Sequence, residues 1–366
     1  MQPDVSLFPL AGAGPFLGKN RLKIGLEISS LAFPLSGIQV YINGIVHALR
    51  SLDTTNHYIL TTKAKQYLKL REYGASSFWL RSFDVYHGLD GFLPGAVRAA
   101  LKSAIVHDVL FLKSGDYHTA EQRQRLLRKL YRLTRRADVL ITPSLATKKD
   151  LSALFPAERI YVVPNGCSES FRPMSAATLA DFRQGLGVDR YLLFVGVFQR
   201  RKNIERLLDA FKIIRGTIPG LKLIMVTSYF GYGSTEVMQK VSEMKGDIFL
   251  KRGVGQEELV SLYNGAEAFL FPSLAEGFGL PVLEAMACGT PVVTSRISSM
   301  PEIGGDAVVY CDPYDTTDIA SVTLDVLGSE ARKRELRQLG LSRAAGFTWT
   351  ESARGVMSVW EKNLCP

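Results

Sequence analysis

The hydrophobic positions of this chain alternate between two spacings along most of its length. Residues 22–29 form a short, mostly apolar run, which is typical of a buried strand. In residues 37–52, which follow, apolar side chains recur every three or four positions and predict an amphipathic helix. The alternation returns in the second half, where strand 191–198 precedes helix 204–215 and a further strand at 222–227. Such repeated strand–helix units predict α/β domains built on parallel sheets.

The length of 366 residues is sufficient for two domains, each with its own core. Asn165–Gly166 is a strong turn signal that follows the last strand of the first half, so we expect the domain boundary close to it. The expected division is an N-terminal extension at 1–20, a first domain at 21–168, a second domain at 169–348 and a C-terminal helix at 349–366 that crosses back to the first domain.

Composition narrows the class of protein. An apolar content of 46% and a charged content of 22% are ordinary for a soluble globular enzyme. No apolar run is long enough for a transmembrane helix. The four cysteines, at 167, 288, 311 and 365, show neither a disulfide framework nor metal-ligand spacing. We therefore expect a reduced, cytoplasmic protein without a bound metal.

The net charge of +9 is confined to the first half of the chain. Residues 1–170 contain 22 Lys and Arg against 13 Asp and Glu, whereas residues 171–366 contain 22 of each. Residues 121–136 form a predicted helix with seven basic residues and one acid. That helix has either an ordinary solvated face or a face that attaches to anionic lipid at the inner side of the cell membrane. No basic groove interleaved with aromatic residues is present, so nucleic acid is not an expected partner.

The stretch 271–293 contains the most concentrated candidate chemistry. Glu276 precedes a helix that is expected to begin at Pro281, and Glu284 is placed in the first turn of that helix. The amides of Gly277, Phe278, Gly279 and Leu280 surround the helix N-terminus, which favours an anionic or oxygen-rich ligand. Two carboxylates beside such amides can accept hydrogen bonds from sugar hydroxyls. The alternative is a glycine-rich turn with two solvated acids.

Three further positions carry candidate binding groups. Arg201 and Lys202 stand where a loop meets a helix N-terminus, so together they can neutralise a diphosphate leaving group; a basic surface turn is the alternative. Gly37 opens the first helix after a strand, where a diphosphate can approach the backbone, although an isolated glycine there is more often a plain turn. His107 ends a strand at the edge where ligands of α/β proteins gather, although an isolated histidine is more often structural.

The sequences of two segments closely resemble motifs of glycosyltransferase family 4. EGFGLPVLEA at 276–285 resembles the E-x7-E motif of that family, and LFVGVFQRRKNIERLLDAF at 193–211 resembles its segment with the Arg-Lys-Asn triplet. The resemblance extends over about 22–362. It implies the glycosyltransferase-B fold, an α/β architecture of two doubly wound Rossmann-like domains that face each other across a cleft.

The resemblance also implies roles for the candidate residues. Arg201 and Lys202 bind the donor diphosphate, Glu276 and the amides of 277–280 hold the sugar, and Glu284 holds the ribose. His107 lies near the donor sugar. Further donor contacts are expected at Gly37, Gly196 and Val254.

The activity implied is metal-independent, retaining transfer of a hexose from a nucleotide sugar, with no cofactor. The form of both motifs resembles mannosyltransferase-like members that build bacterial surface polysaccharides such as lipopolysaccharide. We therefore expect GDP-mannose as the donor and a saccharide or polyprenyl-linked saccharide as the acceptor. UDP-glucose and UDP-N-acetylglucosamine are the alternative donors. A phosphorylase or epimerase of the same fold, and a two-domain sugar-nucleotide-binding protein without catalysis, are the alternative functions.

Overall fold

A computed structural model describes residues 21–32, 37–63, 66–70, 74–77, 82–113, 117–228 and 235–364. The extension expected at 1–20 lies outside these residues. The chain forms two compact units. The C-terminal unit consists of Tyr117 and Cys167–Gly346. The N-terminal unit consists of all other described residues before Cys167 and of the segment from Phe347 onward. The boundaries expected at 168 and 348 lie two residues from these limits.

The N-terminal unit is built on a parallel sheet of seven strands in the order β3-β2-β1-β4-β5-β6-β7. The strands are β1 (Lys23–Glu27), β2 (His57–Thr62), β3 (Ser76–Ser77), β4 (Ser82–Gly88), β5 (Arg98–Ile105), β6 (Val139–Thr142) and β7 (Ile160–Val162). The register pairs Gly25 with Ile59 on one side and with Tyr86 on the other. β1 is therefore a central strand, which explains why its sequence is apolar on both faces.

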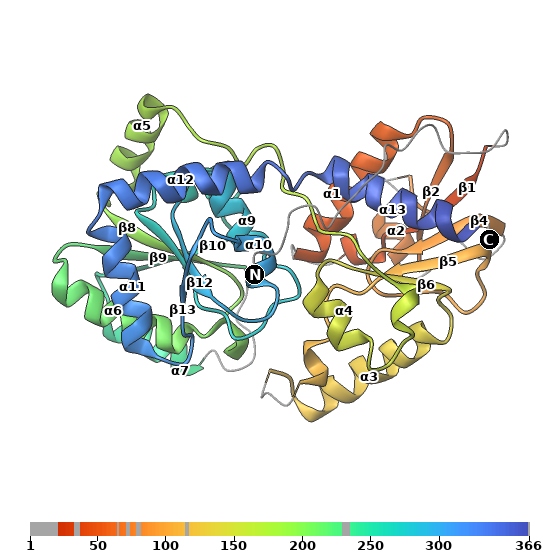
Figure 1. Ribbon diagram of the computed structural model, residues 1–366, viewed down its shortest axis with the longest axis horizontal. Helices are drawn as coiled ribbons and strands as arrows, with labels where there is room; N and C mark the ends of the chain where they lie inside the picture. The colour runs from red at the N-terminus through yellow and green to blue at the C-terminus, as the bar shows by residue number, and fades with distance from the viewer. Residues whose placement is uncertain are drawn as a thin grey trace. The chain divides into compact units, whose positions relative to one another are not determined.

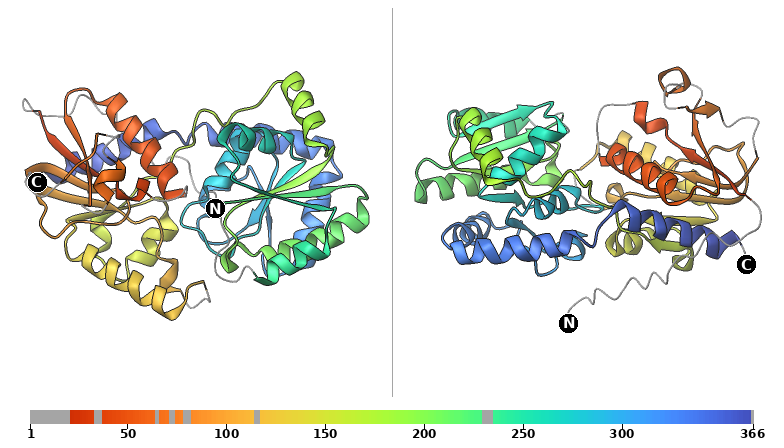
Figure 2. Two further views of the ribbon diagram at one scale, coloured as in Figure 1. Left: turned by 180° about the vertical axis from the view of Figure 1, so that it is seen from behind. Right: turned by 90° about the horizontal axis from the view of Figure 1, so that it is seen from above.

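Helices cover both faces of this sheet (Figures 1 and 2). They are α1 (Gly37–Leu52), α2 (Tyr67–Leu70), α3 (Ala120–Thr134), α4 (Leu145–Leu151) and α13 (Trp349–Leu364). One hydrophobic core joins α1 and α13 to the sheet through Ile42, Ile45 and Trp360. A second core, which joins α3 and α4 to the sheet, contains Leu130 and Leu151. Two cores on one sheet are the mark of a doubly wound fold.

The last helix of the chain belongs to the N-terminal unit. α13 packs against α1, as its position beside α1 in Figure 1 shows. Ser352 Oγ donates to the carbonyl of Pro164 at 2.6 Å, and the ring of Trp349 meets that of Tyr41 edge-on at 5.8 Å. These contacts join the C-terminal segment to the N-terminal unit.

The C-terminal unit repeats the plan with six parallel strands in the order β10-β9-β8-β11-β12-β13. The strands are β8 (Tyr191–Val195), β9 (Lys222–Thr227), β10 (Ile248–Arg252), β11 (Ala268–Phe271), β12 (Val292–Ser295) and β13 (Val309–Cys311). The helices are α5 (Ala176–Leu186), α6 (Ile204–Thr217), α7 (Thr235–Glu243), α8 (Gln256–Gly265), α9 (Leu280–Ala287), α10 (Met300–Gly304), α11 (Thr316–Leu327) and α12 (Glu330–Ala344). In Figure 1, α6, α7 and α11 lie on one side of the strands and α9 and α12 on the other.

Two doubly wound α/β units confirm the predicted fold class. Two details differ from the sequence-based expectations. Helix α5, which follows the boundary between the units, was not predicted, and none of its residues is buried. Helix α9 begins one residue before Pro281, so Glu284 lies in its second turn rather than its first. Among the described helices, none is long and apolar enough to cross a membrane.

Candidate active site

The strand order of the C-terminal unit creates a ligand-binding position at one edge of its sheet. β8 and β11 are neighbours, but the chain leaves them toward opposite halves of the sheet, to β9 and to β12. Loops that diverge in this way leave an opening at the carboxyl ends of the strands, where α/β proteins bind ligands. The loop after β8 contains Arg201 and Lys202, and the loop after β11 contains Glu276. The sequence candidates therefore meet at this switch point.

The loop after β8 is held in place from behind. Arg200–Lys202 form a single 3-10 turn, and Asn203 follows in the left-handed conformation with φ of 57°. The buried Asn203 amide donates to the carbonyl of Pro272 at 3.0 Å and to that of Pro313 at 2.6 Å. Asparagine tolerates this backbone conformation better than most residues. Asn203 thus fixes the direction in which the two preceding cations point.

Glu276 is the centre of the site. Its Oε2 accepts from Arg201 Nη1 at 2.7 Å, and its Oε1 accepts from Lys202 Nζ at 2.6 Å. Lys202 Nζ also lies 4.4 Å from the centroid of the Phe271 ring. Burial by itself would raise the pKa of Glu276, but the charges of Arg201 and Lys202 bring that pKa below its ordinary value. Glu276 is therefore ionised at neutral pH and can only accept hydrogen bonds.

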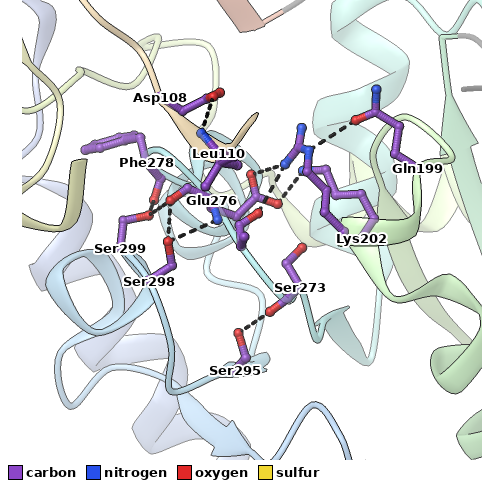
Figure 3. A network of polar contacts seen from close by, with 12 residues as sticks. Asp108, Leu110, Gln199, Lys202, Ser273, Glu276, Phe278, Ser295, Ser298 and Ser299 are labelled. Carbon is purple, nitrogen blue, oxygen red and sulfur yellow. Dashed lines mark hydrogen bonds and ion pairs between the residues drawn. The ribbon is translucent and has the colours of Figure 1, made fainter. Parts of the chain in front are cut away.

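Two serines, which the sequence analysis did not identify, fix the loop that carries Glu276. Ser298 Oγ accepts from the Glu276 amide at 3.2 Å and donates to the Glu276 carbonyl at 2.6 Å. Ser299 Oγ is 2.7 Å from the carbonyl of Phe278. Figure 3 shows Glu276 between Lys202 on one side and these serines on the other. The only sequence signal was their position directly after a strand.

The start of α9 brings backbone amides and a second glutamate to the same loop. Gly279 caps the helix with φ of 118°, a conformation that residues with a side chain rarely adopt. Glu284 Oε2 accepts from the Tyr263 hydroxyl at 2.9 Å, and burial raises the pKa of Glu284 to about 7. Both glutamates are less than 10% exposed. The alternative of two solvated acids is therefore wrong.

The remaining candidates of this unit lie along the same sheet edge. Gly196 directly follows β8, and a Cβ atom there would lie 3.6 Å from Lys202 Cε, so the backbone closely approaches the lysine. Val254 is half-buried in the loop between β10 and α8. Phe278 is buried, whereas Gly277 and Leu280 are partly exposed.

Two candidates belong to the N-terminal unit. Gly37 is the exposed first residue of α1. His107 follows β5 at the carboxyl edge of the sheet, and its Nε2 donates to the carbonyl of Leu89 at 3.1 Å. Its ring meets the ring of Tyr41 edge-on at 4.9 Å, and burial lowers its pKa. His107 is thus neutral at physiological pH, and Nδ1 is its remaining acceptor.

Two protein families match the chain in separate segments. Residues 36–171 match Glycosyltransferase Family 4, and residues 181–341 match the group 1 glycosyl transferases. The second segment contains Arg201, Lys202, Glu276 and Glu284.

Individual relatives agree with this assignment. The chain is 31% identical over 271 residues to an O-antigen chain mannosyltransferase B from Escherichia coli, which covers 72% of this chain and 71% of that protein. It is 30% identical over 256 residues to an MMP alpha-(1->4)-mannosyltransferase from Mycolicibacterium hassiacum, covering 66% and 60% of the two chains.

Solved structures show the same fold. A sucrose-phosphate synthase from Thermosynechococcus elongatus matches with a TM-score of 0.73 and 20% identity over 93% of this chain and 99% of that one. The Anabaena protein HepE, in complex with UDP-glucose, matches with a TM-score of 0.72 and 17% identity over 92% and 98%. Two family matches that together span most of the chain, with a mannosyltransferase relative aligned over more than two thirds of its length, place this protein in glycosyltransferase family 4, the group 1 glycosyltransferases of GT-B fold.

Proposed function

We propose that this glycosyltransferase moves mannose from GDP-mannose to a saccharide acceptor, with retention of configuration at the anomeric carbon and without a metal ion. The observation that carries the proposal is the cluster of Arg201, Lys202 and Glu276 at the switch point of the C-terminal unit. Mannose as the transferred sugar is supported by the names of the relatives, an O-antigen chain mannosyltransferase and a serotype-specific mannosyltransferase among them. The same names support surface polysaccharide as the product.

The two cations supply the electrostatic part of the reaction. When the glycosidic bond to the nucleotide breaks, negative charge develops on the departing diphosphate. Arg201 and Lys202 stabilise that charge, which is the task that a divalent ion performs in other transferases. Because Asn203 already holds this turn in place, the cations need little reorganisation when charge develops. Gly196 lets the diphosphate approach the same position.

The acceptor groups around the cations bind the rest of the donor. Ionised Glu276 and the amides of 277–280 hold the sugar hydroxyls, and Glu284 accepts from the ribose hydroxyls. Val254 contacts the base, and Gly37 contributes a phosphate contact from the N-terminal unit. His107, a neutral imidazole with Nδ1 as acceptor, binds a sugar hydroxyl. No covalent glycosyl intermediate is part of this proposal.

The acceptor is proposed to be lipid-linked, and the enzyme to work at an anionic membrane surface. Leu127 and Tyr131 on α3 are 38% and 62% exposed, and they lie among the basic residues of that helix. An exposed apolar pair surrounded by cations suits the boundary of an anionic bilayer.

The first experiment is thermal unfolding of the purified chain with GDP, GDP-mannose, UDP, UDP-glucose and UDP-N-acetylglucosamine. A ligand at a hundred times its dissociation constant stabilises the folded state by about 2.7 kcal/mol, which raises the midpoint by a few degrees. We expect the rise with GDP and GDP-mannose. A rise with the UDP compounds alone would replace the donor and keep the transferase. Proton NMR of the transferred anomeric centre then tests retention, because an inverted product contradicts the mechanism.

A further inference from the structure

The N-terminal unit contains a cavity that none of the roles above uses. Its volume is about 520 Å³, within the range of roughly 300–1,000 Å³ that is usual for small-molecule sites. One wall is α3, and the other is formed by Lys63, which follows β2, and by Gly91–Leu93, in the loop after β4. The cavity therefore opens at the carboxyl edge of the sheet, next to the switch point between β1 and β4.

The walls of this cavity are strongly cationic. Six basic residues line it: Lys63, Arg125, Arg128, Lys129, Arg132 and Arg136. Among the described residues, no carboxylate lines it. Asp90 lies behind Lys63, 3.8 Å from its Nζ, and Asp90 also accepts from Ser30 Oγ at 2.7 Å. The charge of Lys129 also acts on the Asp90 carboxylate, so both lysines are partly neutralised and the four arginines remain.

The cations contributed by α3 occupy regular positions along the helix. Positions 125, 128, 129, 132 and 136 recur at helical spacing, so they share one face of α3 and its C-terminal extension. Lys129 Nζ donates to the carbonyl of Asp90 at 2.7 Å, and Arg136 Nη1 donates to the carbonyl of Leu93 at 3.0 Å. Both bonds tie α3 to the opposite wall. The side chains of Arg125 and Arg132 form no hydrogen bond or ion pair with any other described residue.

The cavity also has an apolar part. Phe92, Leu93, Leu126 and Leu133 contribute to its lining. Lys63 Nζ lies 3.9 Å from the centroid of the Phe92 ring, which places a cation directly over this surface. A fully hydrated polyanion gains nothing from contact with an apolar surface. A phosphate group attached to a hydrocarbon chain can contact both the cationic and the apolar walls.

We propose that this cavity binds the diphosphate of a lipid-linked acceptor, with the first part of the lipid chain against Phe92 and the leucines. The identification of this ligand as the acceptor rests on the proposed function. Binding by the cavity is a separate property from attachment to a membrane, because Leu127 and Tyr131, the exposed apolar pair of α3, are not among the residues that line it. The cavity binds a single acceptor molecule, whereas the outer face of α3 contacts the membrane surface.

The test is calorimetric titration of the full chain with farnesyl diphosphate, in the presence of saturating GDP so that the nucleotide site is occupied. Farnesol and inorganic diphosphate are titrated in parallel. The test variant is Arg125→Gln/Arg132→Gln, which removes two lining cations without breaking a hydrogen bond within the described residues. The matched control is Arg123→Gln/Arg135→Gln, which removes the same charge from the same helix outside the cavity.

We expect farnesyl diphosphate to bind more tightly than either comparator, with affinity reduced at least about tenfold in the test variant, or ~1.4 kcal/mol, and unchanged in the control. Equal losses in both variants would mean unspecific attraction and overturn the proposal. Inorganic diphosphate that binds as tightly as farnesyl diphosphate would overturn the lipid assignment. The comparison of the two variants assigns binding to the cavity whether or not GDP occupies the donor site. Failure of nucleotide binding in the donor panel therefore leaves this result intact, and loss of farnesyl diphosphate binding leaves the donor site intact.

Discussion

The side chain of Lys202 is charged although it is only 7% exposed, and it tolerates this burial because it contacts Glu276 and the Phe271 ring. Replacement by alanine removes one of two charges that face the departing diphosphate. We expect Lys202→Ala to lower kcat by about 10²–10³-fold, the usual effect of losing one stabilising group for developing charge. Lys212→Ala, at an exposed position on α6, is the matched control. Full activity in Lys202→Ala would disprove the role of this residue.

The stability of the same variant needs its own control, because a buried charge that loses its partner destabilises the fold. Removing one member of a buried pair costs about 3–5 kcal/mol, although Arg201 remains on Glu276 and reduces this loss. Lys202→Met also removes the charge, but it keeps an apolar side chain of similar length against the Phe271 ring and leaves Glu276 paired with Arg201. We expect Lys202→Met to be more stable than Lys202→Ala and equally inactive, as measured by urea unfolding and by turnover.

Glu284 titrates near neutrality, since burial raises its pKa to about 7. Its ionised form accepts hydrogen bonds from ribose, so affinity for GDP-mannose should rise as the pH increases through about 7. GDP-mannose is the proper probe because its diphosphate has no ionisation in that range. Glu284→Gln should remove the pH dependence and weaken binding at pH 8. A pH dependence that persists in Glu284→Gln would assign the titration to another group.

The raised pKa of Glu27 affects the stability of the fold rather than ligand binding. Glu27 is fully buried at the end of β1, where burial and the neighbouring Asp90 raise its pKa from 4.5 to about 8. The folded state therefore binds one more proton than the unfolded chain between these two values. Stability of the N-terminal unit should decrease as pH rises through this interval, by a few kcal/mol in total, and level off above it.

Glu27→Gln mimics the protonated acid and should abolish most of this decrease. Trp349 and Trp360 belong to the N-terminal unit, and residues 167–346 contain no tryptophan, so tryptophan fluorescence reports the unfolding of the N-terminal unit separately. Urea titrations at pH 5 and pH 9 test the prediction. An equal decrease in the variant and the parent chain would show that another group titrates.

At the scale of elements, the start of α9 depends on one glycine. Gly279 has φ of 118°, and a Cβ there would lie 2.5 Å from Met300 Cε. Gly279→Ala should destabilise the chain by roughly 1–3 kcal/mol and move the amides of 277–280 away from the donor. Gly185→Ala is the control, because Gly185 lies within α5 with open space around it and should gain up to about 1 kcal/mol. Unchanged GDP-mannose affinity in Gly279→Ala would contradict the assigned role of these amides.

At the scale of the whole molecule, the distribution of charge predicts where the protein works. The excess of nine positive charges lies within residues 1–170, which include α3. We expect sedimentation with vesicles that contain anionic lipid and release between about 0.05 and 0.5 M salt, as screening shortens the reach of exposed charges. Leu127→Ser/Tyr131→Ser should reduce vesicle binding and leave farnesyl diphosphate binding unchanged. Equal binding to neutral vesicles would reject an electrostatic membrane face.

Local patterns in the sequence were enough to predict the elements and the kinds of residue at the site. Helix α1 at Gly37–Leu52 and strand β9 at Lys222–Thr227 coincide with their predicted ranges, because apolar periodicity is a local property. Gly289, which follows α9, has φ of 75°, the left-handed conformation that a glycine after a helix commonly adopts. The resemblance of the 276–285 segment likewise needed only adjacent residues.

The groups that come together from distant parts of the chain could be identified only from the fold. Arg201 and Glu276 are 75 positions apart and meet because β8 and β11 are neighbours, a pairing that no local pattern encodes. The support of Ser298 for the Glu276 loop and the cavity between α3 and the loop after β4 have the same origin. Strand order brings loops from distant parts of the chain to one sheet edge. The sequence therefore predicted which residues form the site, but their geometry depends on the fold.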